Sequence, residues 1–564
     1  MDDVDSVQAQ IARNMLNSGD WVTARLDGVA YLEKSPLLYW MMAASYRIFG
    51  VHDWAARLPL ALAVVLLCWV TYRFGRWVFD DEAGLYAGVT LATSVGLFLF
   101  TRILIPDAIL TLVITGAIWA WLRMFEPERE STLRWSVALG ACLGIGLLLK
   151  GLIAVVFPLA AGLAYMAITR QLVSADSWRR LHLGVAAVVA LVITVPWHVL
   201  ATMRNPPYFS SSLRSGPGEY HGFFWFYFVN EHLLRFLNTR YPRDYNTVPR
   251  LWFWLLNLVW IFPWSGYLLG LGDLSFRADS RAGRARLMAL CSIGTVLLFF
   301  TFSTTQEYYS MPIYPAVALL VGSVLGSGSR WVLRSTRALQ AIFLLLFVAL
   351  STLLLLVWRQ PAPGNIANAL AQHPELYSFS LGHMQDLTLH AFAYLKLPLA
   401  LAAFAFGGGV VVLFASRRNV RRTVLVLAAT MIVFFQAARI ALIRFEDYLG
   451  SYPLAQSLLQ NPPGRLIEAD AYYAFSSVFF YTGRTAFLLN GRNNNLEYGS
   501  YAPDAPDVFI DDARFVAMWS QPGRYYLLAY GAELPHLEHL VGRSNLCVVK
   551  ENAGNYLLTN HPLS

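Results

Sequence analysis

Two of the four lysines in this chain lie beside long apolar runs, where a charged side chain is costly. Lys34 stands in YLEKSP and Lys150 in LLLKGL, in a chain that has 39 arginines. Asp107, in ILIPDAIL, occupies a similar place. Ionisable groups at the edge of hydrocarbon are retained mainly where they function, so these three residues are candidates for a binding or catalytic site.

The chemistry of these residues suits a phosphate. An ammonium is a compact charge that binds phosphate oxygens, which is the functional interpretation of Lys34 beside Tyr31 and Glu33. The alternative is an interfacial anchor whose stem lies along lipid. Asp107 follows Pro106 and could be a helix N-cap. A carboxylate so close to hydrocarbon needs a partner, and Lys150 is one candidate, in a site or in a purely structural ion pair.

Acids also gather at the start of the chain. Asp2, Asp3 and Asp5 precede SVQAQIARNMLN, residues 6–17, whose apolar side chains recur with helical spacing. Three carboxylates there predict a general base or a metal site, while helix capping is the competing interpretation. A second amphipathic helix is expected over 36–50, lying along the membrane interface.

A third group lies in the loop 202–250, within FVNEHLLRFLNTRYPRDY. Glu231 and His232 could ligate zinc or another divalent ion, although adjacent helical residues point in different directions, which makes the metal signal weak. The arginines more plausibly meet an anionic head group; they are Arg235, Arg240 and Arg243. The outer turn 304–315, TTQEYYSMPIYP, adds Gln306, Glu307, Tyr308 and Tyr309.

The elements that must position these residues are membrane helices. Hydrophobic residues make up 57% of the chain, charged residues 14%, and the mean hydropathy is +0.47. Twelve apolar runs long enough to span are expected. They are 56–79, 83–101, 104–124, 134–149, 151–169, 182–201, 251–271, 287–303, 312–329, 338–358, 395–415 and 423–442. The stretch 134–169 could instead be one long kinked helix.

Arginine-rich loops orient these spans. Alternate short loops carry the arginines and should be cytoplasmic, so residues 1–55, the loop 202–250 and the C-terminal region face outward. The net charge of +8 then mostly reflects topology and is no sign of nucleic acid, which we do not expect as a partner. Residues 1–20 belong outside with no span before them. We therefore expect a missing first helix, the alternative being a terminus translocated without help.

Three domains are predicted. They are an outer segment with two interfacial helices at 1–55, a transmembrane domain at 56–444 and a small outer α/β domain at 445–564. Strands are expected in YYAFSSVFFYTG, APDVFIDD, RYYLLAYG and LCVVKENAGNYLLTN. A loop that could take part in acceptor recognition is expected in LLNGRNNNLEYGSYAPDAPD. The four cysteines form no paired framework.

An outward-facing site with carboxylates, cations and aromatic rings suits sugar transfer from a lipid-linked phosphate donor. Cations would stabilise the leaving phosphate, and an acid would deprotonate the acceptor or hold a metal. A flippase or transporter of polyprenyl lipids is the rival, but it predicts charges at mid-membrane and repeated halves. A non-catalytic scaffold would leave the clustered charges unexplained.

The segment IARNMLNSGDWVTARLDGVAYLEKSPLLYWMMAASYRIFG resembles the first outer loop of the lipid-carrier-dependent glycosyltransferases. This superfamily comprises the protein O-mannosyltransferases and the transferases of 4-amino-4-deoxy-L-arabinose to lipid A, and the aminoarabinose branch is the more similar. The order of Asp107, Lys150, EHLLRF and YYSMPIYP extends the resemblance over most of residues 6–320.

The resemblance implies an all-α polytopic GT-C-type fold with thirteen spans, in a bacterial inner membrane with the active face and C-terminal domain periplasmic. It implies an undecaprenyl-phosphate sugar donor and an acceptor such as lipid A, another glycan or a protein. By motif position, Glu33 would be a metal-associated acid with His232 as partner. Lys34, Arg235 and Lys150 would contact the donor phosphate, Tyr31 and Tyr309 would line the cavity, and Asp107 would be the second acid.

The sequence departs from the family pattern at the start of its first helix. Aligned without a gap, Val4 falls on the family's aspartate, Asp5 on its glutamate and Val7 on an arginine of the aminoarabinose enzymes. A small shift would instead make Asp3 or Asp2 the catalytic aspartate, which we favour. Without that arginine, the sugar or the acceptor could differ from those of the aminoarabinose branch.

Overall fold

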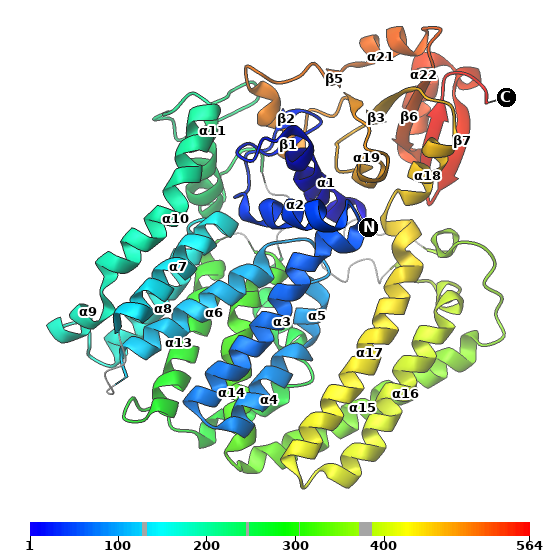
Figure 1. Cartoon of the computed structure of the whole chain (residues 1–564). Helices are drawn as coiled ribbons and strands as arrows, with labels where there is room; N and C mark the ends of the chain where they lie inside the picture. Colours follow the sequence, from blue (N-terminus) through cyan, green and yellow to red (C-terminus); the bar gives the residue numbers. More distant parts are fainter. Residues whose placement is uncertain (127–131, 244–247, 304, 371–385, 564) are drawn as a thin grey trace.

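The computed structural model describes residues 1–126, 132–243, 248–303, 305–370 and 386–563. Long helices run side by side, and a small sheet domain lies above them (Figure 1). Within the described residues, nine helical segments have the length and apolar character to cross a membrane, and one bent pair is a tenth candidate. The chain is therefore a multi-pass membrane protein.

The candidate spans follow the chain in order. They are α3 (Asp53–Val78), α6 (Asp107–Met124), α7 (Thr132–Lys150), α9 (Ala175–Leu181) with α10 (Leu183–Arg204), α13 (Arg281–Phe302), η3 (Glu307–Ile313) with α14 (Tyr314–Gly326), α15 (Arg330–Val357), η7 (Ala391–Leu395) with α16 (Lys396–Ser416), and α17 (Val420–Leu449). The bent pair is α12 (Arg250–Trp260) with η2 (Ser265–Asp273), at 91°.

Three expected spans differ in the structure, so the described residues do not confirm the count of twelve. The run 83–101 is broken into α4 (Asp81–Ala92) and α5 (Val95–Phe100), because the backbone N–H of Val95 donates to Phe262 O instead of continuing the helix. The run 151–169 becomes α8 (Ile153–Ile168), which is only 16 residues long. Gly151, with φ of +76°, ends α7, so 134–169 is not one helix. The run 251–271 is the bent pair.

Two short helices lie across the top of the spans (Figure 1). They are α1 (Asp3–Ser18) and α2 (Leu37–Phe49), joined by the hairpin of β1 (Arg25–Leu26) and β2 (Val29–Ala30). Both helices were predicted from the sequence. The apolar stripe of α1 is buried at Val7, Ile11 and Met15, which explains the helical spacing of these residues.

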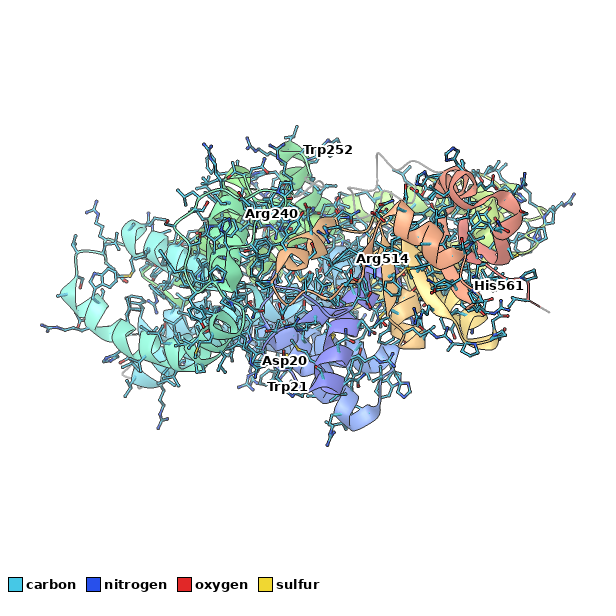
Figure 2. The ribbon with its side chains drawn as sticks, turned by 90° about the horizontal axis from the view of Figure 1, so that it is seen from above. Asp20, Trp21, Arg240, Trp252, Arg514 and His561 are labelled. Carbon is cyan, nitrogen blue, oxygen red and sulfur yellow. The ribbon has the colours of Figure 1, made fainter. Side chains whose placement is uncertain are left out.

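The loop 202–250 carries short helical turns. It contains α11 (Gly222–Phe224) and the π-helix η1 (Trp225–Leu234). The later loop that follows α15 contains η4 (Ile366–Ala369). Seen from above, Asp20 and Trp21 lie on the N-terminal segment, Arg240 on the outer loop, and Arg514 and His561 on the C-terminal domain (Figure 2). The three parts meet on one side of the spans, so residues far apart in sequence can share one site.

The C-terminal domain is α/β, with a six-stranded sheet in the order β5-β4-β3-β6-β8-β7. The strands are β3 (Arg465–Ala469), β4 (Ala486–Leu489), β5 (Phe509–Ile510), β6 (Tyr525–Tyr530), β7 (Cys547–Asn552) and β8 (Asn555–Thr559). The helices are α18 (Tyr452–Gln460), α19 (Ser476–Thr482), α20 (Asn494–Glu497), η8 (Gly499–Tyr501), α21 (Asp512–Trp519), η9 (Gly531–Glu533), α22 (Leu534–Val541) and η10 (Arg543–Asn545).

The strand predictions hold for β6 and for the β7–β8 hairpin, and in part for β5. The prediction of a strand in YYAFSSVFFYTG is wrong, because its second half forms α19. Phe475, Val478 and Phe479 are fully buried, and Gly483, with φ of +67°, caps the helix. Packing against α1 therefore overrides the strand preference of the aromatic residues.

Candidate functional site

A cavity of about 160 Å³ lies between the segment after β2, the start of α6, the end of α7, η1 and η3. Its wall combines carboxylates, cations and aromatic rings. The charged and titratable residues of the lining, apart from its tyrosines, are Glu33, Lys34, Asp107, Lys150, Glu231, His232 and Arg235. Seven of the eleven predicted site residues line this cavity: Glu33, Lys34, Asp107, Lys150, His232, Arg235 and Tyr309.

Asp107 and Lys150 form an ion pair in this wall. Lys150 Nζ lies 2.5 Å from Asp107 Oδ1 and 4.7 and 5.3 Å from the ring centres of Tyr309 and Tyr308. Pro106 holds the N-cap position, so Asp107 is the first residue of α6 and does not cap it. Its other oxygen, Oδ2, is buried and has no hydrogen-bond partner among the described residues. The predicted pairing of the two residues is confirmed.

Gly151 allows the chain to turn behind Lys150. An added Cβ would lie 2.0 Å from His232 Nε2, so only glycine fits at this close approach. His232 Nε2 accepts from the N–H of Leu152 at 3.1 Å, and its Nδ1 lies 2.5 Å from Tyr227 O. The imidazole therefore links η1 to the turn between α7 and α8.

The π-helix η1 positions Glu231 and Arg235. π-Helical turns occur frequently at functional sites. Arg235 Nη1 donates to Glu231 Oε2 at 2.8 Å, and its Nη2 donates to the hydroxyl of Tyr309 at 3.2 Å. Arg240 donates to both oxygens of Glu231, at 2.7 and 2.9 Å. Burial opposes ionisation, but the two guanidinium groups hold the pKa of Glu231 below its ordinary value.

Glu33 and Lys34 enter the cavity from the segment between β2 and α2. Ser35 fixes this segment, because its hydroxyl donates to Leu147 O at 3.0 Å. Lys34 Nζ lies 3.6 Å from Glu33 Oε2, and its side chain is one-third exposed. Glu33 Oε1 has no hydrogen-bond partner among the described residues. Burial raises the pKa of Glu33, Lys34 opposes this rise and Glu231 adds to it.

Tyr31 lies behind Glu33 and does not line the cavity. Its hydroxyl donates to Glu33 Oε2 at 3.3 Å, and its side chain is buried. It contacts a carboxylate of the site, whereas Tyr309 lines the cavity as expected.

The three N-terminal acids do not line this cavity, and each has another partner. Asp2 caps α1 by accepting from the N–H of Asp5 at 2.9 Å. Asp3 accepts from the N–H of Ser477 at 2.7 Å and from Ser451 Oγ at 3.0 Å. Asp5 forms an ion pair with Arg57 and accepts from the N–H of Leu104 at 2.7 Å. This geometry agrees with the capping interpretation of Asp2 and gives Asp3 and Asp5 structural roles.

The expected metal ligands are poorly arranged for a metal. Both ring nitrogens of His232 are engaged, and Glu33 pairs with Lys34. Throughout the described ranges, no three His, Cys, Asp or Glu side chains lie together in a way that could hold an ion. The residues as placed do not fit a metal, and the metal stays a prediction.

Several residues that brace the segments of the site were not predicted from the sequence. The hydroxyl of Tyr227 is hydrogen-bonded to that of Ser35. Asn230 Nδ2 donates to Tyr241 O at 2.7 Å, and this bond braces the segment that carries Arg240. Ser35 follows Lys34 directly, so its place beside the site could have been read from the motif. Nothing in the sequence links Tyr473, which donates to Tyr31 from 442 residues away.

Comparison with known proteins agrees with these observations. Residues 33–199 match the family model of dolichyl-phosphate-mannose-protein mannosyltransferases, a stretch that begins at Glu33 and includes Asp107 and Lys150. An undecaprenyl phosphate-alpha-4-amino-4-deoxy-L-arabinose arabinosyl transferase of Erwinia tasmaniensis is 24% identical over 518 residues, 89% of this chain and 84% of the relative. One from Pseudomonas fluorescens is 30% identical over 328 residues, 56% of this chain and about half (51%) of that relative.

The fold is similar to that of solved structures. ArnT from Cupriavidus metallidurans bound to undecaprenyl phosphate superposes with a TM-score of 0.79 and 22% identity, covering 99% of this chain and 93% of that one. Its apo form gives a TM-score of 0.74. The resemblance to the lipid-carrier-dependent glycosyltransferases and the predicted fold class, mostly helical with a small C-terminal α/β domain, are confirmed.

Proposed function

We propose that this chain, a membrane glycosyltransferase that uses a lipid-linked donor, transfers a sugar from undecaprenyl phosphate to a lipid A-type glycolipid at the outer, periplasmic face of a bacterial inner membrane. The observation that carries the proposal is the cavity wall itself. Three cations, Lys34, Lys150 and Arg235, converge there beside the carboxylates of Glu33 and Asp107, each of which has one buried oxygen without a hydrogen-bond partner among the described residues. The names of the aminoarabinose transferases support the choice of donor and of acceptor class.

The cations would serve the donor phosphate. In the transfer, an acceptor oxygen bonds to the anomeric carbon while the bond from that carbon to the phosphate oxygen breaks. The polyprenyl phosphate leaves with the electron pair. Lys34, one-third exposed at the cavity wall, and Arg235, held by Glu231 and Tyr309, would stabilise the charge that develops on that oxygen.

The carboxylates would serve the acceptor. Glu33 lies in the cavity wall beside Lys34, with Arg240 Nη2 4.0 Å from its Oε1, and burial raises the pKa of this acid, which suits a group that must take a proton. Asp107 is neutralised by Lys150 at 2.5 Å, and its Oδ2 could orient the acceptor hydroxyl. We assign the base to Glu33 and not to Asp2, Asp3 or Asp5, because those acids are occupied by other partners.

Purified protein in nanodiscs tests the proposal. Undecaprenyl phosphate carrying a radiolabelled sugar, 4-amino-4-deoxy-L-arabinose first, would be supplied with lipid A, with another glycolipid or with protein. Label in the lipid A fraction is expected. Label in another fraction would identify a different acceptor. Movement of the donor across a bilayer with no new glycoside would favour a lipid flippase.

A further inference from the structure

The carboxylate of Glu33 is reached from the C-terminal domain by a row of hydrogen bonds. Asn495 Nδ2 donates to the hydroxyl of Tyr473 at 2.8 Å, and the Tyr473 hydroxyl donates to that of Tyr31 at 3.2 Å. Tyr31 then donates to Glu33 Oε2 at 3.3 Å. Every bond in the row donates in the same direction, toward the carboxylate.

We propose that Tyr473 and Asn495 are positioning residues for the transfer reaction, which orient Glu33 through Tyr31 and so make the C-terminal domain part of the active site. The inference rests on the proposed function and deepens it. The row ends on Oε2, which also lies 3.6 Å from Lys34 Nζ, while Arg240 Nη2 lies 4.0 Å from the buried Oε1. The hydrogen bond from Tyr31 therefore fixes the carboxylate between these two cations.

The location of the row supports a role beyond packing. Tyr31 and Glu33 are nearly inaccessible, with 2% and 6% exposure, so water does not substitute for a lost donor. Consecutive hydrogen bonds in such a place polarise one another. Partners behind a reacting group that fix its orientation commonly change activity by about 10- to 100-fold when removed.

The same segment of the C-terminal domain also braces the opposite wall. Glu497, two residues after Asn495, accepts from the hydroxyls of Tyr241 and Tyr501. Tyr498 stacks on Phe226 at 4.0 Å and accepts from the N–H of His221 at 2.8 Å. Helix α20 and the residue after it thus contact both the support of Glu33 and the loop that carries Glu231.

Two matched pairs of variants test the inference. Tyr473→Phe removes one hydroxyl from the row. Tyr472→Phe removes a neighbouring hydroxyl that is not part of the row, and the Tyr472 ring stacks on Phe479 at 4.5 Å. Asn495→Asp keeps the shape but replaces the donor with an acceptor, so Tyr473 would turn its proton away from Tyr31. Asn494→Asp adds the same charge one residue away, where Asn494 Nδ2 donates to Asn493 Oδ1 at 3.2 Å.

We expect Tyr473→Phe and Asn495→Asp to lower kcat about tenfold, with KM for the donor within about twofold. The two control variants should match the wild type, and all four should keep the wild-type melting temperature within a few degrees. Wild-type kcat in both test variants would overturn the inference. Equal losses in the control variants would show a merely structural role and overturn it too. A wild type that transfers no sugar would overturn the proposed function itself, and the inference with it.

Discussion

Two groups of buried carboxylates lie at the end of the helices that faces the C-terminal domain, and they differ in how fully their oxygens are hydrogen-bonded. In the N-terminal group, Asp3 and Asp5 use both oxygens on the protein itself. In the cavity group, Glu33 and Asp107 each keep one oxygen without a hydrogen-bond partner among the described residues. Acids at one end of the helices therefore do not by themselves make a site, whereas Glu33 and Asp107 line a cavity together with cations.

The largest effect should come from removing the most exposed cation of the cavity. Lys34→Met keeps the length of the stem but deletes the charge, so sugar transfer should fall about 10²-fold as the leaving phosphate loses a partner. Binding of undecaprenyl phosphate, measured by titration in nanodiscs, should weaken as well. Lys396→Met is the matched control, because Lys396 donates to Gln360 O at 2.7 Å and does not line the cavity. Equal behaviour of the two variants would contradict the role of Lys34.

A second test displaces the cavity wall without changing its charge. Gly151→Ala places a methyl group 2.0 Å from His232 Nε2, so the Lys150 turn or η1 must move. A shift of about 1 Å in positioned groups can lower a rate about 100-fold, and we expect a loss of this size in the transfer assay. Gly294→Ala, in α13 with open space around it, should leave the rate unchanged. A Gly151→Ala variant with the wild-type rate would show that this turn does not position the site.

A smaller effect is expected where charge is kept but geometry is lost. Arg235 bridges Glu231 and Tyr309, which a lysine cannot do with one ammonium. Arg235→Lys should therefore lower kcat/KM about tenfold. Arg514→Lys, which alters an exposed pair with Asp507 at 2.6 Å, should have no effect. Full activity of Arg235→Lys would mean that charge alone is needed there.

The N-terminal group should respond in stability and not in transfer. Burial raises the pKa of Asp3 to about 7 from 3.8, although its hydrogen bonds to Ser477 and Ser451 oppose the rise. A carboxyl whose pKa is higher in the folded state stabilises the fold at low pH. This contribution is lost as the pH rises from about 4 through 7, at up to about 1.4 kcal/mol per pH unit.

Asp3→Asn should remove that pH dependence, because a neutral amide can accept from Ser477 and donate to Ser451. The melting temperature in detergent, followed from pH 5 to pH 8, should fall more steeply for the wild type than for the variant, with transfer unchanged at pH 7. The variant keeps part of the fall, because burial also raises the pKa of Asp5 and of Asp27 to about 7. Parallel melting curves would show that Asp3 is ionised throughout.

Much of the cavity could be predicted because its residues stand in short motifs at the ends of apolar runs. Lys34, Asp107, Lys150 and Arg235 were identified in this way, and the structure brings all four to one cavity. The N-terminal acids were expected in the site but do not line this cavity. The sequence shows where a carboxylate is, but not which groups it binds. Asp3 meets Ser477 across 474 residues, a contact that no local pattern encodes.

The same limit applies to the fold. The periodic helices α1 and α2 and the β7–β8 hairpin were predicted, because their patterns are local. The break at Thr93 and Ser94 depends on contacts of α5 with α12, and the sequence suggested a continuous span there. The helix α19 depends on contacts with α1, and the sequence suggested a strand there. The row from Asn495 to Glu33 crosses three segments and was likewise beyond sequence reasoning.

The most direct test of the account measures initial rates of sugar transfer per mole of folded protein for three variants side by side. Glu33→Gln keeps the shape of the side chain but cannot accept a proton, and its rate should fall about 10²-fold, as much as that of Lys34→Met. The double variant Asp2→Asn with Asp3→Asn, and separately Asp5→Asn, should keep rates close to the wild type. A Glu33→Gln variant with full activity, or loss of transfer in a folded N-terminal variant, would return the catalytic base to α1 and contradict the account.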